Sequence, residues 1–327
     1  MKKIIIIFTG GTISMKKDEK NNAAMPAMSG EDILKLTPNM ENVADIQFLD
    51  FGMMPGPHIT PEDMQELSKL INRKLEFEGY DGVIVTHGTD SLEETAYFVD
   101  LTYNGLKPVI FVGSMKNSSE LGWDGPSNLI SAVHTAISDE AKNRGVLVVM
   151  SEEVHAASQV TKTDTHSLHT FKSMDFGPIG FVDNSKVHFY YSYTKRQYIP
   201  SGKIHSNIDI IKCGCGMDHR LLTLSVDSGA HGIVIEAMGR GNIPPKMVPG
   251  VEYALSKNIP VILVSRCFMG KVFDDYGYEG AGRELTERGV ILGDNLSGQK
   301  ARIKLMVALG YTKDLSKIKD IFEKNYY

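Results

Sequence analysis

Three segments of this sequence carry polar side chains in the stretches that follow runs of apolar residues. Thr12 follows "IIIIF" and two glycines, Thr89 and Asp90 follow "VIV", and Lys162 lies in the loop after "VLVVM". A threonine hydroxyl can attack a carbonyl carbon if a base removes its proton, and a lysine becomes such a base where its surroundings favour the neutral amine. These residue types could therefore carry out nucleophilic attack on a carbonyl group.

The neighbours of these residues suit the same chemistry. A carboxylate beside the lysine, Asp90 or Asp164, could hold its ammonium group and orient a substrate. Gly10 and Gly11 allow a tight backbone turn, and their N–H groups could stabilise an oxyanion.

Each feature also has a simpler explanation when it is taken alone. "TGGT" could be a phosphate-binding turn, although it matches neither common nucleotide-binding glycine pattern. Thr89 and Asp90 could cap a helix that begins at Ser91. His87 and His155 stand singly, without the spacing of metal ligands, so we expect no metal site.

The elements that must position these residues alternate between strands and helices. We predict strands at 4–8, 83–85, 109–112, 146–149, 221–226, 232–237 and 260–265. We predict helices at 61–77, 91–103, 126–142, 248–256, 298–309 and 315–325. Continuous apolar strands that alternate with amphipathic helices indicate an α/β fold whose parallel sheets are covered on both faces. Parallel sheets place ligands at the carboxyl ends of their strands, so the four candidate side chains could meet in one crevice.

The pattern changes near residue 176, where a turn-rich, strand-like segment replaces the helices and Asn184-Ser185 reads as a hairpin turn. Alternation resumes near residue 209. We therefore predict an α/β domain at 1–195, a linker at 196–208 and a second α/β domain at 209–327.

Composition and charge narrow the function classes. The net charge is -5, and the cluster formed by Lys16, Lys17 and Lys20 is interrupted by acidic residues, so we expect no nucleic-acid partner. No apolar run approaches the length of a membrane span, and the short run after Lys3 fits a strand better than a signal peptide. Three cysteines, with no signal segment, favour a reducing cytoplasm.

Taken together, these segments resemble the bacterial-type L-asparaginase/glutaminase family of amidohydrolases. The similar segments are "TGGTIS", "VTHGTDSLEETAYF", "VGSMKNSSELGWDGPSNLISAV", "QVTKTDT", "AMGRGNIP" and "LSGQKARIKLMVAL", in order along nearly the whole chain. The resemblance implies a larger, flavodoxin-like amino-terminal α/β domain and a smaller carboxyl-terminal one. It also implies a homodimer or homotetramer, an amino-acid amide as substrate and no cofactor.

The resemblance further implies a role for each matching residue. Thr12 is expected to be the nucleophile that forms an acyl-enzyme and releases ammonia. Thr89, Asp90 and Lys162 are expected to support it, with Thr89 helping to activate water and Asp90 holding the substrate α-ammonium. The expected substrate-binding residues are Gly11, Gly56, Pro57, Gly88, Ser114 and Asn242, the last reaching a neighbouring subunit's site.

The sequence departs from the family in three places. The segment after Thr12 lacks the tyrosine that many members carry there, and "MPAM" resembles a subgroup's alternative segment. Gly56 stands where that subgroup has a serine that binds the substrate α-carboxylate. Either the Gly56 backbone N–H replaces the hydroxyl, or the pocket takes a bulkier or modified amide. Trp123, the only tryptophan, is either a packing residue or a platform for such a substrate.

Alternatives to L-asparagine hydrolysis stay open. One is an amidase for a modified, D-configured or bulkier asparagine- or glutamine-type substrate. Another is a non-catalytic ligand-binding member of the fold, and a third is a nucleotide-binding α/β protein. A tRNA-dependent amidotransferase subunit is disfavoured, because such subunits carry an extra amino-terminal domain and this sequence starts at its first strand.

Overall fold

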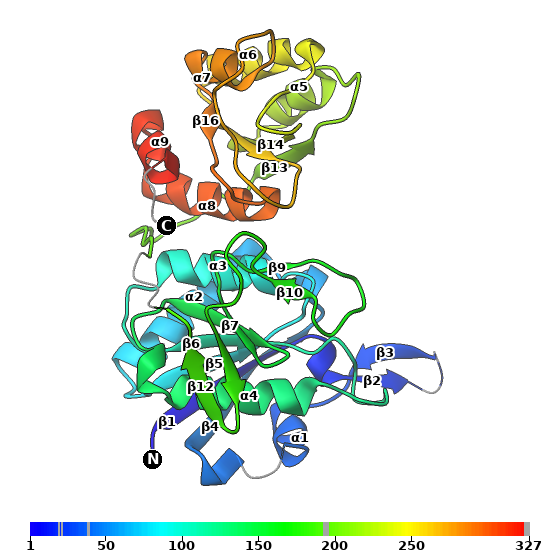
Figure 1. The fold of residues 1–327 in the computed structure, drawn as a ribbon, viewed down its shortest axis with the longest axis vertical. Coiled ribbons are helices and arrows are strands. Elements are labelled where there is room, and N and C mark those ends of the chain that lie inside the picture. Colours follow the sequence, from blue (N-terminus) through cyan, green and yellow to red (C-terminus); the bar gives the residue numbers. More distant parts are fainter. Residues whose placement is uncertain (19, 21, 38–39, 192–195, 324–327) are drawn as a thin grey trace. The chain divides into compact units, whose positions relative to one another are not determined.

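The chain folds into two compact units, Met1–Tyr198 and Ile199–Tyr327, shown in Figure 1. The structure is a computed structural model, and it describes residues 1–18, 20, 22–37, 40–191 and 196–323. The predicted boundary at residue 195 falls on residues 192–195, which lie outside the described part. The division into 1–195, 196–208 and 209–327 therefore stays a prediction.

An eight-stranded sheet forms the centre of the first unit. In spatial order its strands are β12 (Lys186–Phe189), β11 (Gly180–Asp183), β8 (Glu153–Ala156), β7 (Val146–Met150), β6 (Val109–Val112), β5 (Gly82–Thr86), β1 (Lys3–Gly10) and β4 (Asp45–Met54). The strands from β7 to β4 run parallel, whereas β8, β11 and β12 add antiparallel pairs at one edge. Numbered along the chain, the parallel strands have the order 2-1-3-4-5, which is the flavodoxin-like order.

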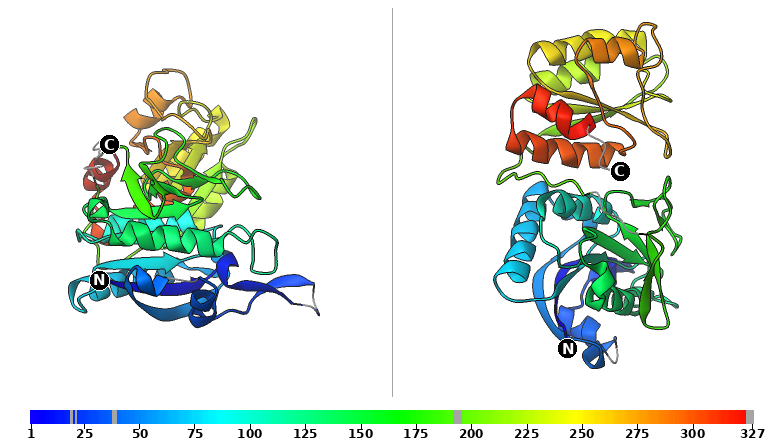
Figure 2. Two further views of the ribbon diagram at one scale, coloured as in Figure 1. Left: turned by 60° about the horizontal axis from the view of Figure 1, so that its bottom comes forward. Right: turned by 60° about the vertical axis from the view of Figure 1, so that its left-hand side comes forward.

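Helices cover both faces of this sheet. Helix α2 (Pro61–Glu76) packs against α3 (Leu92–Thr102) on one face, and α4 (Gly125–Ile137) contacts β5, β6 and β7 on the other, as Figures 1 and 2 show. The residues of β5, β6 and β7 are accordingly all buried. Burial on both faces explains why these strands read as continuous apolar runs. The short helix α1 (Gly30–Lys35) lies against β4.

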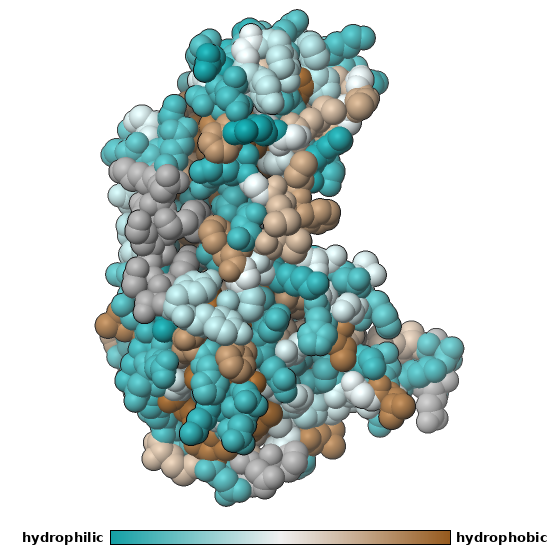
Figure 3. Space-filling model, in the orientation of Figure 1, coloured by the Kyte–Doolittle hydropathy of each residue, from teal (hydrophilic) through white to brown (hydrophobic). Residues whose placement is uncertain are grey.

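Two small hairpin-like pairs leave the main sheet. Strands β2 (Met15–Asp18) and β3 (Ala23–Pro26) pair antiparallel directly after the first strand, and they project from the body of the first unit in Figures 1 and 3. Strands β9 (Thr161–Lys162) and β10 (Phe171–Lys172) pair antiparallel farther along the chain. The first pair follows Thr12 and the second contains Lys162, so both belong to segments with predicted chemistry.

The second unit has its own four-stranded parallel sheet. Its strands are β13 (Ile208–Lys212), β14 (Gly232–Ala237), β15 (Val261–Ser265) and β16 (Ile291–Leu292). Helices α5 (Arg220–Asp227) and α6 (Val248–Ser256) pack together, while α8 (Gly298–Tyr311) contacts β13, β14 and β15. Helix α7 (Gly282–Glu287) precedes β16, and α9 (Leu315–Glu323) packs on β16 and α8.

The predicted fold class is confirmed, with some corrections to individual elements. Residues 221–226 belong to α5 and not to the expected strand, because Leu222 and Val226 recur at helical spacing on the buried side. Strands β4 and β13 and the β2–β3 pair are absent from the predicted elements. The predicted helix at 126–142 ends at Ile137, and Ser138 instead starts a 3-10 turn. The last helix is described only to Glu323, so its predicted end at residue 325 lies outside the described residues.

The predicted hairpin turn is confirmed. Asn184 and Ser185 join β11 to β12 with positive φ angles of 45° and 63°, which is typical of a tight two-residue turn. Among the helices of the described residues, none is long and apolar enough to cross a membrane.

Candidate active site

The candidate site lies where the order of the parallel strands reverses. Strand β1 lies between β4 and β5 in the sheet. After β1 the chain first adds β4 on one side, and then returns past β1 to add β5, β6 and β7 on the other side. Loops at such a switch point diverge above the carboxyl ends of the strands, and α/β proteins bind ligands there. Thr12 follows β1 and Thr89 follows β5, so the fold places these two residues in neighbouring loops.

The glycine pair before Thr12 is required by the backbone. Gly10 and Gly11 have φ angles of 107° and 80°, and the ψ angle of Gly11 is -176°, a combination that is nearly confined to glycine. The N–H of Gly11 donates to the Met54 carbonyl oxygen at 3.0 Å. This N–H is therefore occupied, and the expectation that it stabilises an oxyanion is wrong.

Thr9 ties the end of β1 to the end of β5. Its hydroxyl is buried and donates to the carbonyl oxygen of Thr86 at 2.8 Å. After the two glycines, Thr12 begins a short 3-10 turn, η1 (Thr12–Ser14), and Ser14 Oγ donates back to the Gly11 carbonyl at 2.8 Å. The Thr12 side chain is partly exposed, and its hydroxyl bonds to no described residue, so it is open to a ligand.

Three glycines from three loops meet backbone to backbone beneath Thr12. A Cβ atom on Gly11 would lie 2.4 Å from the Gly88 nitrogen, and one on Gly88 would lie 2.7 Å from the Gly56 Cα. Real Cβ atoms essentially never approach that closely. Ser91 Oγ locks the third loop by donating to the Gly56 carbonyl at 2.6 Å. This set, called the glycine stack below, is formed by three of the predicted substrate-binding residues.

The structure brings Thr89, Asp90 and Lys162 together. The Lys162 Nζ atom lies 2.9 Å from Thr89 Oγ1 and 2.7 Å from Asp90 Oδ1. Thr89 is buried, the Lys162 side chain is 17% exposed and the Asp90 side chain is 62% exposed. A half-exposed ion pair contributes little to stability, so this arrangement makes more sense as chemistry than as packing.

The alternative that Thr89 and Asp90 cap a helix is not supported. The residue at the N-cap of α3 is Ser91, and its hydroxyl bonds to Gly56 rather than to its own helix. The backbone N–H groups of Gly88 and Thr89 donate to no described residue, so both can donate to a ligand.

Other predicted residues have partners of their own. Ser114 is fully buried, and its hydroxyl bonds to Asp124 Oδ1 at 2.7 Å and to the Lys116 carbonyl. Any contact between Ser114 and a substrate would therefore come from its backbone. Asp164 accepts hydrogen bonds from the N–H groups of His166 and Ser167, which lower its pKa, so it stabilises its own exposed turn.

The structure also shows the surroundings of Gly56 and Trp123, the residues at which the sequence departs from the family. A Cβ atom on Gly56 would lie 3.3 Å from Ser91 Oγ and 3.4 Å from the Gly88 backbone, which leaves little spare room there. Pro57 next to it is exposed. Trp123 is half-buried and packs against the core of the first unit, which favours packing over a substrate platform.

Asn242 lies in the second unit, in the turn after β14. Its backbone forms a bridge with Met238, while its side-chain Oδ1 is buried without a partner among the described residues. A buried amide oxygen without a partner is costly, so a ligand or a further chain could satisfy it. Its predicted role at a neighbouring subunit's site stays a prediction.

His87 lies under the site as a neutral ring. Burial lowers its pKa from 6.5 to about 4, although Nδ1 lies 2.9 Å from the Gly88 carbonyl oxygen. The described residues contain no cluster of three His, Cys, Asp or Glu side chains that could hold a metal ion.

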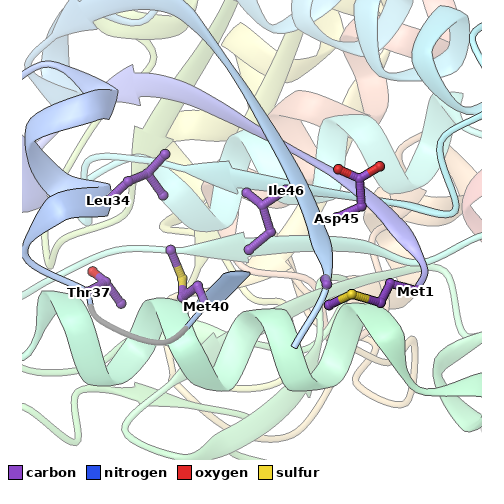
Figure 4. A pocket seen from close by; sticks show the side chains of 7 residues that line it. Met1, Leu34, Thr37, Met40, Asp45 and Ile46 are labelled. Atoms are coloured by element: carbon purple, nitrogen blue, oxygen red, sulfur yellow. The ribbon is translucent and has the colours of Figure 1, made fainter. Parts of the chain in front are cut away.

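A pocket of about 510 Å³ lies elsewhere in the first unit and is shown in Figure 4. Its lining residues are Met1, Leu34, Thr37, Met40, Ala44, Asp45 and Ile46. None of them is a predicted site residue, and Asp45 is the only charged side chain among them. The candidate site is therefore defined by its side chains and backbone groups, and not by this pocket.

Sequence reasoning missed the residues that hold the site together. Thr9, Ser91 and Asp124 fix three loops through hydrogen bonds between groups distant in sequence. The only local signal was a polar residue directly after an apolar strand, as at Thr9.

The chain is similar to known proteins along nearly its whole length. The family model described as "Asparaginase, N-terminal" matches residues 3–195, and "Glutaminase/Asparaginase C-terminal domain" matches residues 207–322. An L-asparaginase of Bacillus licheniformis is 37% identical over 98% of this chain and 99% of its own length. One of the glutamyl-tRNA(Gln) amidotransferase subunits of Methanosarcina mazei is 31% identical over 99% of this chain and 77% of its own length.

The fold also matches a solved structure. The crystal structure of a probable cytoplasmic L-asparaginase from Campylobacter jejuni superposes with a TM-score of 0.89 at 31% identity, covering 99% of this chain and 100% of that one.

The close contact in the glycine stack predicts that one methyl group added at Gly11 lowers the stability of the fold unusually strongly. Gly11→Ala adds a Cβ against the Gly88 backbone and also strains a conformation that is nearly confined to glycine. We expect it to lower the free energy of unfolding by more than about 3 kcal/mol. Gly79→Ala is the matched control, because Gly79 has a φ of 77° and open space around it, and should cost roughly 1–2 kcal/mol. Equal losses in chemical denaturation would contradict the close contact.

The buried His87 predicts a pH dependence of stability. Its folded pKa lies below its unfolded value, so the unfolded state binds more protons between about pH 4 and 6.5. Stability contributed by the neutral ring is therefore lost as the pH falls through this window. Between pH 6.5 and 5, the free energy of unfolding of the parent should fall by about 1.5 kcal/mol more than that of His87→Gln. Identical pH dependence of the two proteins would show that His87 does not stay neutral on folding.

Proposed function

This chain belongs to the asparaginase family and is an amidohydrolase, and we propose that it hydrolyses L-asparagine to L-aspartate and ammonia through a Thr12 acyl-enzyme. The observation that supports the proposal most is the bonded Thr89–Lys162–Asp90 group in the loops at the switch point of the sheet, where Thr12 follows the neighbouring strand with a hydroxyl that bonds to no described residue. Two full-length matches to proteins named as L-asparaginases support the choice of substrate.

In the first half of the proposed reaction, Thr12 Oγ attacks the carbonyl carbon of the side-chain amide. The hydroxyl proton leaves Thr12 and is delivered to the departing nitrogen, so that ammonia is released and an ester remains on Thr12. Negative charge develops on the carbonyl oxygen, and the open N–H groups of Gly88 and Thr89 can stabilise it. The tight glycine stack supports this step, because it holds the backbone before Thr12 close to the backbone of Gly88.

In the second half, a water molecule attacks the ester and restores the Thr12 hydroxyl. The Thr89 hydroxyl lies within hydrogen-bond distance of Lys162 Nζ. When the amine is neutral, this hydroxyl can accept a proton from the water and pass its own proton to the amine. Asp90 keeps Lys162 in place through Oδ1, while its Oδ2 bonds to no described residue. That free oxygen is suited to a substrate ammonium group.

The proposal extends to assembly and location. We propose a homodimer or homotetramer in which Asn242 contributes its unpartnered amide oxygen to a neighbouring subunit's site. We also propose a cytoplasmic location, which is supported by the match to a probable cytoplasmic L-asparaginase.

One observation favours a second candidate, an amidase for a bulkier or modified amide. Gly56 contributes no hydroxyl to the site, and only its backbone N–H, which bonds to no described residue, is available for an α-carboxylate. A charge-assisted hydrogen bond contributes roughly 1.5–3 kcal/mol. If the backbone supplies no equivalent bond, the site's preference for a substrate with a free α-carboxylate weakens by about tenfold to a hundredfold.

Removing the Thr12 hydroxyl or the Lys162 amine should strongly lower turnover without unfolding the protein. We expect Thr12→Ala to lower kcat for ammonia release from L-asparagine by at least about a thousandfold. Lys162→Met should cost roughly a hundredfold to ten-thousandfold, because it removes the group that holds both Thr89 and Asp90. Lys172→Met on the neighbouring strand β10 is the matched control and should keep full activity. Activity in folded Thr12→Ala would contradict the acyl-enzyme.

A substrate panel separates the two candidates. The parent should saturate at lower concentrations of L-asparagine than of D-asparagine, L-glutamine or an amide-substituted asparagine, because the glycine stack leaves little spare room. A kcat/KM at least about tenfold higher for a derivatised amide would favour the second candidate. No ammonia from any amide, with a folded protein, would leave only a binding role.

A further inference from the structure

A short loop between β6 and α4 is attached to the segment that carries Thr12. Ser118 donates twice to the Met15 carbonyl oxygen, from its N–H at 3.1 Å and from its hydroxyl at 2.9 Å. The N–H of Met15 in turn donates to the carbonyl oxygen of Thr12. A second link joins the same elements, since the Lys17 N–H donates to Ser119 Oγ at 3.0 Å. Met15 therefore bonds to Thr12 on one side and to Ser118 on the other.

This loop, residues 114–124, is held by one carboxylate. Asp124 stands at the N-cap of α4 but does not cap that helix with its side chain. Its Oδ1 accepts from Ser114 Oγ at 2.7 Å and from the Lys116 N–H at 2.9 Å. Its Oδ2 accepts from the Met115 N–H at 3.0 Å and from Asn128 Nδ2 at 2.9 Å. Four bonds to one side chain make the base of the loop rigid, so the loop can act as a fixed support.

The support reaches the other catalytic segments as well. Buried Asn128 donates to the Gly113 carbonyl oxygen at 3.1 Å, and a Cβ on Gly113 would lie 3.1 Å from the Thr89 side chain. Asn128 Oδ1 accepts from the Ser151 N–H at 2.9 Å, and Ser151 Oγ donates to the Leu168 carbonyl at 2.7 Å, in the loop between β9 and β10. The same loop base thus contacts the surroundings of Thr12, Thr89 and Lys162.

We propose that Ser118 and Ser119 are positioning residues for Thr12. Ser118 holds Thr12 through the backbone of Met15, and the loop that carries both serines is fixed by Asp124. The expected effect on catalysis rests on the proposed function. The link between the loop and the β2–β3 pair does not, because it consists of the observed hydrogen bonds. The hairpin projects from the body of the first unit (Figure 3), so bonds at its base decide how firmly its first strand is held. Neither serine touches the predicted reacting groups, and each acts through the backbone of β2.

Two readouts test the proposal in the full-length protein. Hydrogen exchange of the peptide spanning residues 12–18 should become about tenfold faster in the Ser118→Ala/Ser119→Ala double variant, because two hydrogen bonds to β2 are lost. The kcat for ammonia release should fall by a similar factor, while KM changes less than about twofold, since the substrate contacts of Asp90 and Gly88 remain. Ser118→Thr combined with native Ser119 keeps both hydroxyls and should restore both values.

A matched control separates positioning from general destabilisation. Ser138 is half-buried in the same unit, and its hydroxyl also bonds one backbone group, the Glu140 N–H. Ser138→Ala should change neither exchange at 12–18 nor kcat, and all variants should unfold at temperatures close to the parent. Unchanged exchange at 12–18 in the double variant would overturn the proposal, and so would faster exchange with an unchanged kcat.

Failure of the proposed function gives a different pattern. If the parent releases no ammonia from any amide, the hydrolytic function fails, and exchange at 12–18 alone decides whether Ser118 and Ser119 hold the Thr12 segment. Faster exchange in the double variant, reversed by Ser118→Thr, would then support the link, and equal exchange would overturn it.

Discussion

The contact of Gly11, Gly56 and Gly88 is the constraint on which the rest of the site depends. Three loops from three different strands can approach this closely only because none of the residues at the contact has a side chain. The approach sets the position of Thr12, one residue beyond Gly11, and of Thr89, one residue beyond Gly88. The two threonines therefore need no direct bond to each other, since their relative placement is fixed by backbone packing.

On this rigid base, the charged groups of the site serve a clear purpose. Lys162 reaches across from the β9–β10 pair and binds Thr89 and Asp90 with one ammonium group. The buried His87 beneath Gly88 stays neutral, so it adds no charge to the site. Asp90 remains largely exposed and keeps one oxygen free of described partners, which suits a substrate that carries its own positive charge. Packing thus fixes the proposed nucleophile, whereas the proposed proton transfer and substrate binding depend on side-chain electrostatics.

Much of this could be predicted from the sequence, because the strongest signals are local. Apolar strands followed by short polar segments indicate the sheet, the switch-point loops and the four candidate residues, of which the structure brings Thr89, Asp90 and Lys162 together. Longer-range features cannot be predicted in the same way. Residues 221–226 favour a strand in the sequence, since six mostly apolar residues do not distinguish a strand from a short helix. The N–H of Gly11 looks free in the sequence, but its acceptor, Met54, belongs to β4, a strand whose mixed pattern gives no signal. The support formed by Asp124 depends on partners up to 10 positions away and is visible only in the fold.

The proposed reaction requires that Thr12 becomes covalently acylated. Its most direct test is to mix the protein with excess L-asparagine, quench in acid within milliseconds, digest, and weigh the peptide that contains Thr12 by mass spectrometry. A fraction of that peptide should be heavier by one aspartyl group, fragmentation should place the addition on Thr12, and the Thr12→Ala variant should show none. Rapid release of ammonia with no adduct on Thr12, or with an adduct on another residue, would contradict it.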